Sequence, residues 1–159
     1  MRWSDRSAEE ARLLNPSFLA ALVSAAARDF ESQTNEPMPW SLAFVIPALA
    51  LTASTRQALP GSVNAHFSGW LQDHPEIRVG FPTRARSLVP LVREALRLGL
   101  RTGVLKLEDG CLRSVRHPTP RYETTDDVAE CFRAARFFGR WFGRRHDPQT
   151  IFRLLGVTA

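Results

Sequence analysis

Apolar side chains recur at helical spacing along much of the chain, and this pattern predicts a mainly helical fold. Phe18 and Leu22 lie on the apolar face of a helix expected over residues 17–31. Asn15 is suited to cap this helix, and Pro16 to occupy its first position. The same periodicity predicts helical segments over residues 8–14, 55–60, 62–73, 75–99, 125–145 and 148–155.

The stretch over residues 40–51 is apolar on every side, so a helix formed there must be buried on every side. Pro47 lies inside the stretch and is expected to end or bend that helix. Pro82 and Pro90 lie in the segment over residues 75–99. That segment is therefore expected to be one bent helix or two consecutive helices.

In one place along the chain, apolar and polar positions alternate, as they do in a β-strand. Residues 104–107 and 112–115 flank Asp109 and Gly110, and Asp-Gly between two alternating runs is a strong hairpin signal. The predicted fold class is therefore mainly α, a compact single domain over residues 1–159 with about six to seven helices and one β-hairpin. It divides into helical residues 1–100, a hairpin over 103–116 and C-terminal helices over 124–156. Helices followed by a hairpin resemble a winged-helix arrangement, although here a long helix also follows the hairpin.

Composition fits one globular domain. The chain has 159 residues, 44% of them hydrophobic, which is too many for a disordered chain. The longest nearly unbroken apolar run, residues 42–51, is roughly half of the ~20 residues that span a bilayer, so no membrane contact is expected. The N-terminus lacks a signal-peptide core, and we expect a cytoplasmic protein. Cys111 and Cys131 have no second cysteine nearby and are expected to be reduced thiols.

Positive charge is concentrated in the second half of the chain. Residues 1–75 carry 5 Arg against 7 acidic residues, whereas residues 76–159 carry 15 Arg and Lys106 against 9 acidic residues. Arginine offers a planar fork for carboxylate or phosphate and a face that stacks on aromatic rings. The excess suits an anionic partner, but genome composition alone can also produce it.

The predicted helix over residues 125–145 has three distinct faces when residues are placed about 100° apart. The core face holds Val128, Cys131, Phe132, Ala135, Phe138 and Phe142. A second face gathers Arg133, Arg136, Arg140 and Arg144, and a strip between the two holds Phe137 and Trp141. Exposed aromatic rings beside arginines are enriched at protein interfaces and also suit nucleic acid, so these six residues are partner-binding candidates. The alternative is a solvated basic face on an otherwise buried helix.

Further arginines are candidates for nucleic-acid contact. They are Arg86, Arg93 and Arg97, opposite the apolar face of residues 75–99, with Arg113 and Arg116 in the hairpin. Glu108 and Asp109 at the hairpin turn would repel phosphate, which weakens the case for DNA.

The sequence shows no credible active site. His66, His74, His117 and His146 lack the spacing of a metal site, and neither a P-loop nor a nucleophile elbow is present. We expect no catalytic residues, no metal and no cofactor, and hence no enzyme.

A series of short motifs runs through nearly the whole chain. They are NPSFL at 15–19, PMP at 37–39, LAFVIP at 42–47, TRQALP at 55–60, PE at 75–76, RARSL at 84–88, EAL at 94–96, Gly99, AA at 134–135, GRWF at 139–142 and TIFRLLGV at 150–157. In this layout the chain resembles the middle components of bacterial three-component ABC-ATPase systems, small proteins encoded between an ABC ATPase of the SMC/Rad50 type and a variable effector.

The resemblance implies a non-enzymatic adaptor in an anti-phage or plasmid defence complex, similar to the Lamassu type. The ATPase would sense a nucleic-acid state, and the adaptor would relay it to an effector, often a nuclease. Any contact of the chain with DNA would then be made through the complex. The family supplies no catalytic residues to assign. The residues themselves leave a second hypothesis open, a winged-helix DNA-binding regulator.

Overall fold

Helices dominate the computed structural model, which describes residues 15–116, 126–145 and 147–158. The helix predicted over residues 8–14 and the cap at Thr125 lie outside the described residues. The elements are α2 (Pro16–Thr34), β1 (Met38–Pro39), the 3-10 helix η2 (Trp40–Phe44), α3 (Ile46–Ala50), α4 (Ala53–Gln57), α5 (Phe67–Asp73), α6 (Pro75–Arg78), α7 (Phe81–Arg101), β2 (Leu105–Glu108), β3 (Cys111–Ser114), α8 (Asp126–Arg145) and α9 (Pro148–Leu155).

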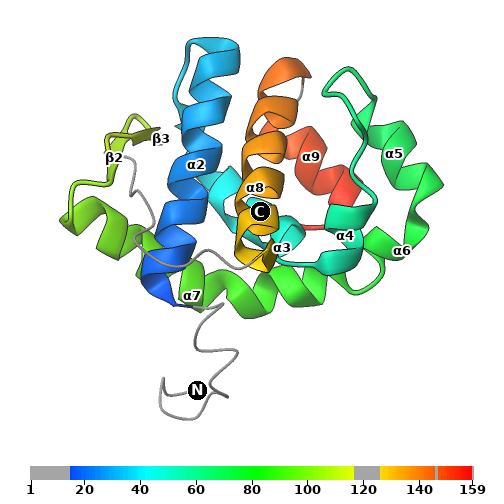
Figure 1. The fold of residues 1–159 in the computed structure, drawn as a ribbon, viewed down its shortest axis with the longest axis horizontal. Helices are drawn as coiled ribbons and strands as arrows, with labels where there is room; N and C mark the ends of the chain where they lie inside the picture. The colour runs from blue at the N-terminus through cyan, green and yellow to red at the C-terminus, as the bar shows by residue number, and fades with distance from the viewer. Residues whose placement is uncertain (1–14, 117–125, 146, 159) are drawn as a thin grey trace.

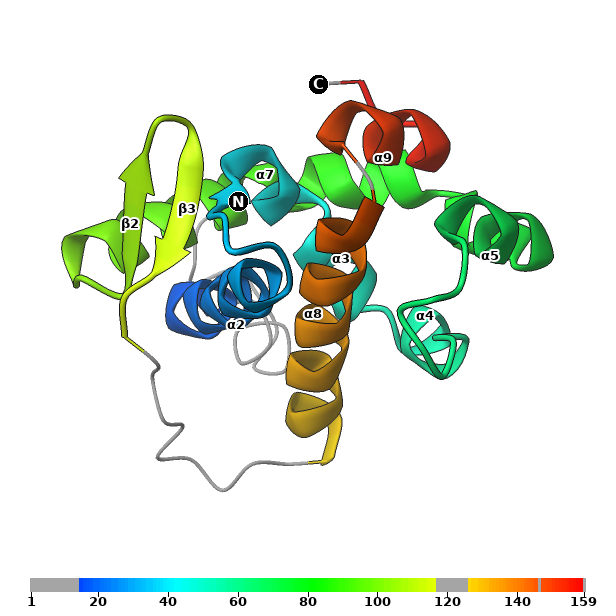
Figure 2. The same ribbon diagram turned by 90° about the horizontal axis from the view of Figure 1, so that it is seen from above.

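The two helices α2 and α8 lie side by side at the centre of the molecule, and α7 packs against α2 (Figure 1). The β-hairpin lies at one end of the molecule, and α4, α5 and α6 lie at the other (Figures 1 and 2). One hydrophobic core joins these elements, as expected for a compact single domain. Of the helices that the structure describes, none has the length and apolar character required to cross a membrane.

Glycines allow α2 and α8 to approach closely. A Cβ added at Gly139 would lie 2.3 Å from the carbonyl oxygen of Ala26, and one added at Gly143 would lie 2.9 Å from Cγ2 of Thr34. Any larger residue at Gly139 would therefore push the backbones of the two helices apart.

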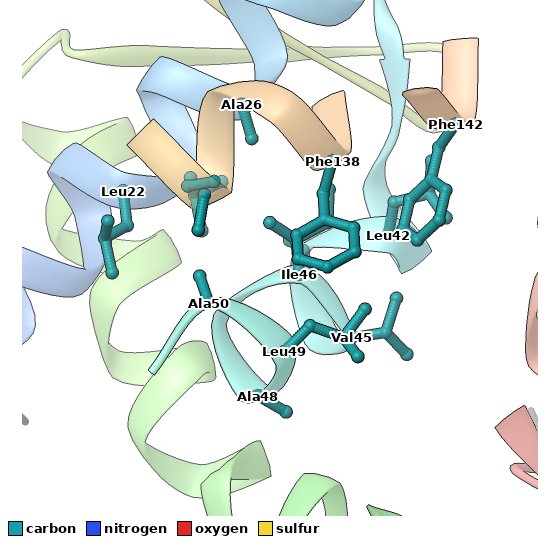
Figure 3. Close-up of a cluster of buried hydrophobic side chains, with 14 of the residues drawn as sticks. Leu22, Ala26, Leu42, Val45, Ile46, Ala48, Leu49, Ala50, Phe138 and Phe142 are labelled. Carbon is teal, nitrogen blue, oxygen red and sulfur yellow. The ribbon is translucent and has the colours of Figure 1, made fainter. Parts of the chain in front are cut away.

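The core lies between α2, α8 and the short helix α3. Figure 3 shows Phe138 and Phe142 of α8 directed toward the segment that carries Leu42 and Ile46. All four of these side chains are fully buried. Of the six core residues predicted for α8, Cys131, Ala135, Phe138 and Phe142 are buried, and Val128 and Phe132 are partly buried.

Of the helix caps expected at Asn15, Ser62 and Asp147, those at Asn15 and Asp147 are confirmed. Asn15 Oδ1 accepts a hydrogen bond of 2.8 Å from the backbone N–H of Ser17 at the start of α2. Asp147 Oδ1 accepts one of 2.8 Å from the backbone N–H of Thr150 at the start of α9. These bonds satisfy amide donors that have no partner within the helix.

The predicted hairpin is confirmed, and the structure adds a strand to it. Asp109 and Gly110 both have positive φ, at 50° and 75°, as a two-residue hairpin turn requires. Strand β1 pairs antiparallel with β3, so the sheet order is β1-β3-β2. The extra strand is only two residues long and includes Pro39, so it left no alternating pattern in the sequence.

Residues 40–51 do not form the single buried helix that the sequence predicted. They form η2 and α3, and Pro47 lies at the start of α3 instead of ending the helix. The expectation of burial on every side is wrong for Trp40, which is 49% exposed. It holds for α3, all of whose residues are buried.

One further helix begins later than predicted, and one segment resolves an alternative that the sequence left open. The helix expected from Ser62 begins only at Phe67, and Ser62 Oγ accepts a hydrogen bond from the backbone N–H of Asn64 in a local turn. The segment over residues 75–99 forms two consecutive helices, α6 and α7, which is one of the two expected arrangements, and α7 continues through Pro90 without a break.

Candidate partner-binding site

Two of the four candidate arginines on α8 are held by a carboxylate of α2. Asp29 is 8% exposed and accepts a short hydrogen bond from Arg140. Arg136 Nε lies 3.7 Å from the other carboxylate oxygen of Asp29. A nearly buried carboxylate loses its hydration, and the positive charges of these two arginines compensate for that loss. The arginines therefore join α2 to α8. Arg133 and Arg144 are exposed and form no ion pair within the described residues.

The expectation that Phe137 and Trp141 form an exposed aromatic strip is wrong. Phe137 is 9% exposed and Trp141 is 1% exposed. The indole N–H of Trp141 donates a 2.8 Å hydrogen bond to the carbonyl of Ala65, and the indole ring packs edge to face on Phe67 at 5.2 Å between centroids. The segment that leads into α5 therefore covers this face of α8. Neither ring offers a surface to a partner.

Ion pairs, one within the hairpin and one with α2, neutralise most of the positive charge of the hairpin. Arg113 Nε lies 3.3 Å from a carboxylate oxygen of Glu31, and Lys106 Nζ lies 2.6 Å from one of Glu108. The hydrogen bond from the Lys106 ammonium lowers the pKa of Glu108, which therefore stays ionised. Within residues 104–116, Arg116 alone is a cation without an ion pair. The hairpin thus presents little net charge to phosphate.

A groove of about 590 Å³ lies between α7, η2 and the end of α9. Its lining runs along α7 from Pro82 to Arg97, a length of about 22 Å at 1.5 Å per residue. In Figure 2, α7 and α9 lie at the same edge of the molecule. The apolar part of the lining consists of Trp40, Phe44, Val45, Pro82, Ala85, Val89, Leu96, Phe152, Gly156 and Val157.

Trp40 forms the exposed wall of this groove. Its ring packs edge to face on Phe44, with 5.4 Å between the centroids. Its backbone N–H donates a 3.0 Å hydrogen bond to the carbonyl of Gly110, so the hairpin turn holds Trp40 in place. A large aromatic ring that is half-exposed and fixed by its backbone is typical of a binding surface.

Three predicted nucleic-acid candidates meet at this groove. Arg86, Arg93 and Arg97 all contribute to its lining and are exposed. Their spacing of seven and four residues places them within about 40° of the circumference of α7. None of the three forms an ion pair within the described part of the chain, and no acidic residue lines the groove. Arg113 and Arg116, the other two candidates, do not line it.

The half-exposed Trp40 and the partly buried Phe44 were not predicted to line a surface groove. Both lie in a nearly continuous apolar run, which hides the fact that its first turn is a separate 3-10 helix. One signal was available, because Trp40 directly follows the two prolines Pro37 and Pro39 and thus stands at the edge of the run. An amphipathic ring at such a boundary suits a partly exposed position.

The described residues contain no group of three His, Cys, Asp or Glu side chains that could hold a metal ion. Burial raises the pKa of the Cys131 thiol, which therefore stays protonated near neutral pH. The apolar lining of the groove and the three exposed arginines beside it suit the binding of a partner.

Comparison with known proteins identifies the family. The family model described as ABC-three component (ABC-3C) system Middle Component 3 matches residues 3–159. No curated protein and no solved structure matches the chain. The resemblance to middle components is thereby confirmed over nearly the full length. The chain belongs to the Middle Component 3 family of ABC-three component systems.

Proposed function

We propose that the chain is a non-enzymatic adaptor that links an SMC/Rad50-like ABC ATPase to an effector in a cytoplasmic complex directed against phages or plasmids. The observation that carries this proposal is the family match over residues 3–159, since a middle component works within a multi-component ABC system. A protein with that role must bind other proteins. The groove lined by α7, η2 and α9 is a surface of the required kind.

An adaptor that joins two proteins needs two separate surfaces. The groove is one of them, and the exposed arginines Arg133 and Arg144 on the outer face of α8 mark a second. No residue of α8 lines the groove, so the two surfaces do not overlap. One partner can therefore occupy the groove while another approaches α8.

Coexpression tests the proposal. The tagged chain is produced together with the ATPase and the effector encoded beside it, then purified with and without nuclease treatment. The proposal predicts that the ATPase and the effector elute with the chain after nuclease treatment, and that omitting the chain separates them. Recovery of the chain alone, or of an ATPase–effector complex that forms without it, would contradict the adaptor role.

The second candidate is a winged-helix DNA-binding regulator. The sheet order β1-β3-β2 and the arginine row on α7 favour it. The ion-paired hairpin and the apolar floor of the groove favour the adaptor instead. The regulator predicts duplex DNA binding by the purified chain that weakens steeply with salt and is lost in Arg93→Ala with Arg97→Ala. An absence of binding at low salt would exclude it.

A further inference from the structure

The adaptor proposal leaves open what occupies the groove. We propose that the groove binds an amphipathic helix with an acidic edge, carried by another component of the same ABC-three component system. This inference rests on the proposed function and names the chemistry of one of the adaptor's partners.

The apolar lining calls for a partner with a row of apolar side chains. Trp40 is half-exposed, and Phe44 and Leu96 are only partly buried, although all three face the same groove. Covering such a surface is favourable by roughly 25 cal/mol per Å² of apolar area removed from water. A helix can place side chains at positions i, i+4 and i+7 along a groove about 22 Å long. Trp40 at the exposed wall is the expected hot spot.

The rim fixes the charge of the partner. Arg86, Arg93 and Arg97 line one side of the groove over about 16 Å along α7, with no carboxylate beside them in the groove lining. Three uncompensated cations on one edge favour a ligand with carboxylates on the matching edge. A helix lying nearly parallel or antiparallel to α7 would match this row with acidic residues spaced by seven and four positions, because both helices share the same rise per residue.

Two other occupants fit less well. Single-stranded nucleic acid is bound by successive exposed aromatic rings along a basic track. Of the three aromatic rings that line this groove, Trp40 is half-exposed, Phe44 is partly buried and Phe152 is buried. A second copy of the chain would bring together two molecules with a formal charge of +5 each. An amphipathic helix of a different protein, with an acidic edge, is complementary to both the apolar lining and the arginines at the rim.

A pair of matched charge reversals tests the inference. Arg93→Glu with Arg97→Glu reverses the groove rim, and Arg133→Glu with Arg144→Glu makes the same change in charge on α8. All four side chains are exposed and form no ion pair within the described residues, so both variants should fold. The affinity for the purified ATPase and for the purified effector is measured separately by calorimetry, with circular dichroism as the control for folding.

The inference predicts that the groove variant loses at least tenfold in affinity for one of the two proteins, while the α8 variant keeps its affinity for that same protein. Trp40→Ala should weaken the same interaction, and added salt should weaken the wild-type interaction more than that of the groove variant. Equal affinity of the wild type and the groove variant for both proteins would overturn the inference and leave the adaptor role intact. Groove-dependent binding of duplex DNA, or groove-dependent self-association, would also overturn it.

If the adaptor proposal is wrong, neither the ATPase nor the effector binds the wild-type chain, and this result differs from those above. In that case a synthetic helical peptide tests whether the groove binds an acidic amphipathic helix. It carries leucines at i, i+4 and i+7 and glutamates spaced by seven and four, and its control carries lysines in place of the glutamates. Binding of the glutamate peptide to the wild type, and not to the groove variant, would support the groove assignment. Equal binding of both peptides, or of neither, would refute it.

Discussion

The close approach of α2 and α8 depends on Gly139, and replacing this residue by alanine tests that dependence. The added Cβ would lie 2.3 Å from the carbonyl oxygen of Ala26, against 3.4–4 Å for an ordinary contact. The nearest atoms belong to the backbone of α2 and cannot rotate away. The two helices must therefore separate by about 1 Å at this point, which loosens the contacts around it.

Two effects of opposite sign set the magnitude. Overpacking a tight core costs about 1–3 kcal/mol, and contact with the backbone places Gly139→Ala at the upper end of that range. Replacing glycine by alanine inside a helix gains up to about 1 kcal/mol. The net expectation is a loss of about 2 kcal/mol in the free energy of unfolding. For a chain of this size, that loss lowers the Tm by roughly 4–8 °C.

Thermal and urea unfolding followed by circular dichroism measure the effect, and two other glycines supply the controls. At Gly69 in α5 the nearest atom to an added Cβ is 3.9 Å away, so Gly69→Ala should be neutral or stabilising. At Gly143 the close atoms belong to the side chains of Thr34 and Phe30, which can shift, so Gly143→Ala should lie between the other two. A Gly139→Ala protein as stable as the Gly69→Ala protein would refute the close packing of α2 and α8.

Three further predictions concern single side chains. Trp141→Ala should lower the free energy of unfolding by about 3–5 kcal/mol because the ring is fully buried, and a mild loss would restore the interpretation of Trp141 as a surface residue. The hydrogen bonds from Thr150 lower the pKa of Asp147, so the stability that Asp147 contributes is present above its unfolded pKa and is lost as pH falls through the folded pKa. Asp147→Ala should therefore be less stable than the wild type at neutral pH, and the difference in the free energy of unfolding should become smaller in acid. A difference that does not change with pH would contradict the capping role. Burial also raises the pKa of Cys131, so a thiol reagent at neutral pH should modify Cys111 first and Cys131 only on unfolding, and equal rates would contradict the burial.

Local signals in the sequence were sufficient to predict most of the helices and the hairpin. Asn15 and Asp147 are caps whose bonds involve residues two or three positions away, and Asp109 with Gly110 forms a turn whose geometry depends on its own two residues. Such features depend on neighbouring residues along the chain, so the sequence alone is enough to indicate them.

The candidate site was harder to predict because it depends on contacts between distant segments. Helical periodicity placed Trp141 on a strip beside the arginines of α8, but only the fold shows that residues 65–67 cover that strip. In the same way, Arg93 was predicted to be exposed, while its place in the same groove as Trp40 follows from the packing of η2 against α7. A periodic pattern identifies the face of a helix and leaves open which other element packs against it.

Amide hydrogen exchange of the chain, measured free and in complex with the ATPase and the effector, shows directly which elements a partner covers. If the groove is the partner-binding site, the complex should slow exchange in η2 and along α7 between residues 82 and 97, where the groove lies. Slower exchange confined to α8, with η2 and α7 unchanged, would contradict the assignment of the groove as the partner-binding site. So would a complex that protects none of these elements.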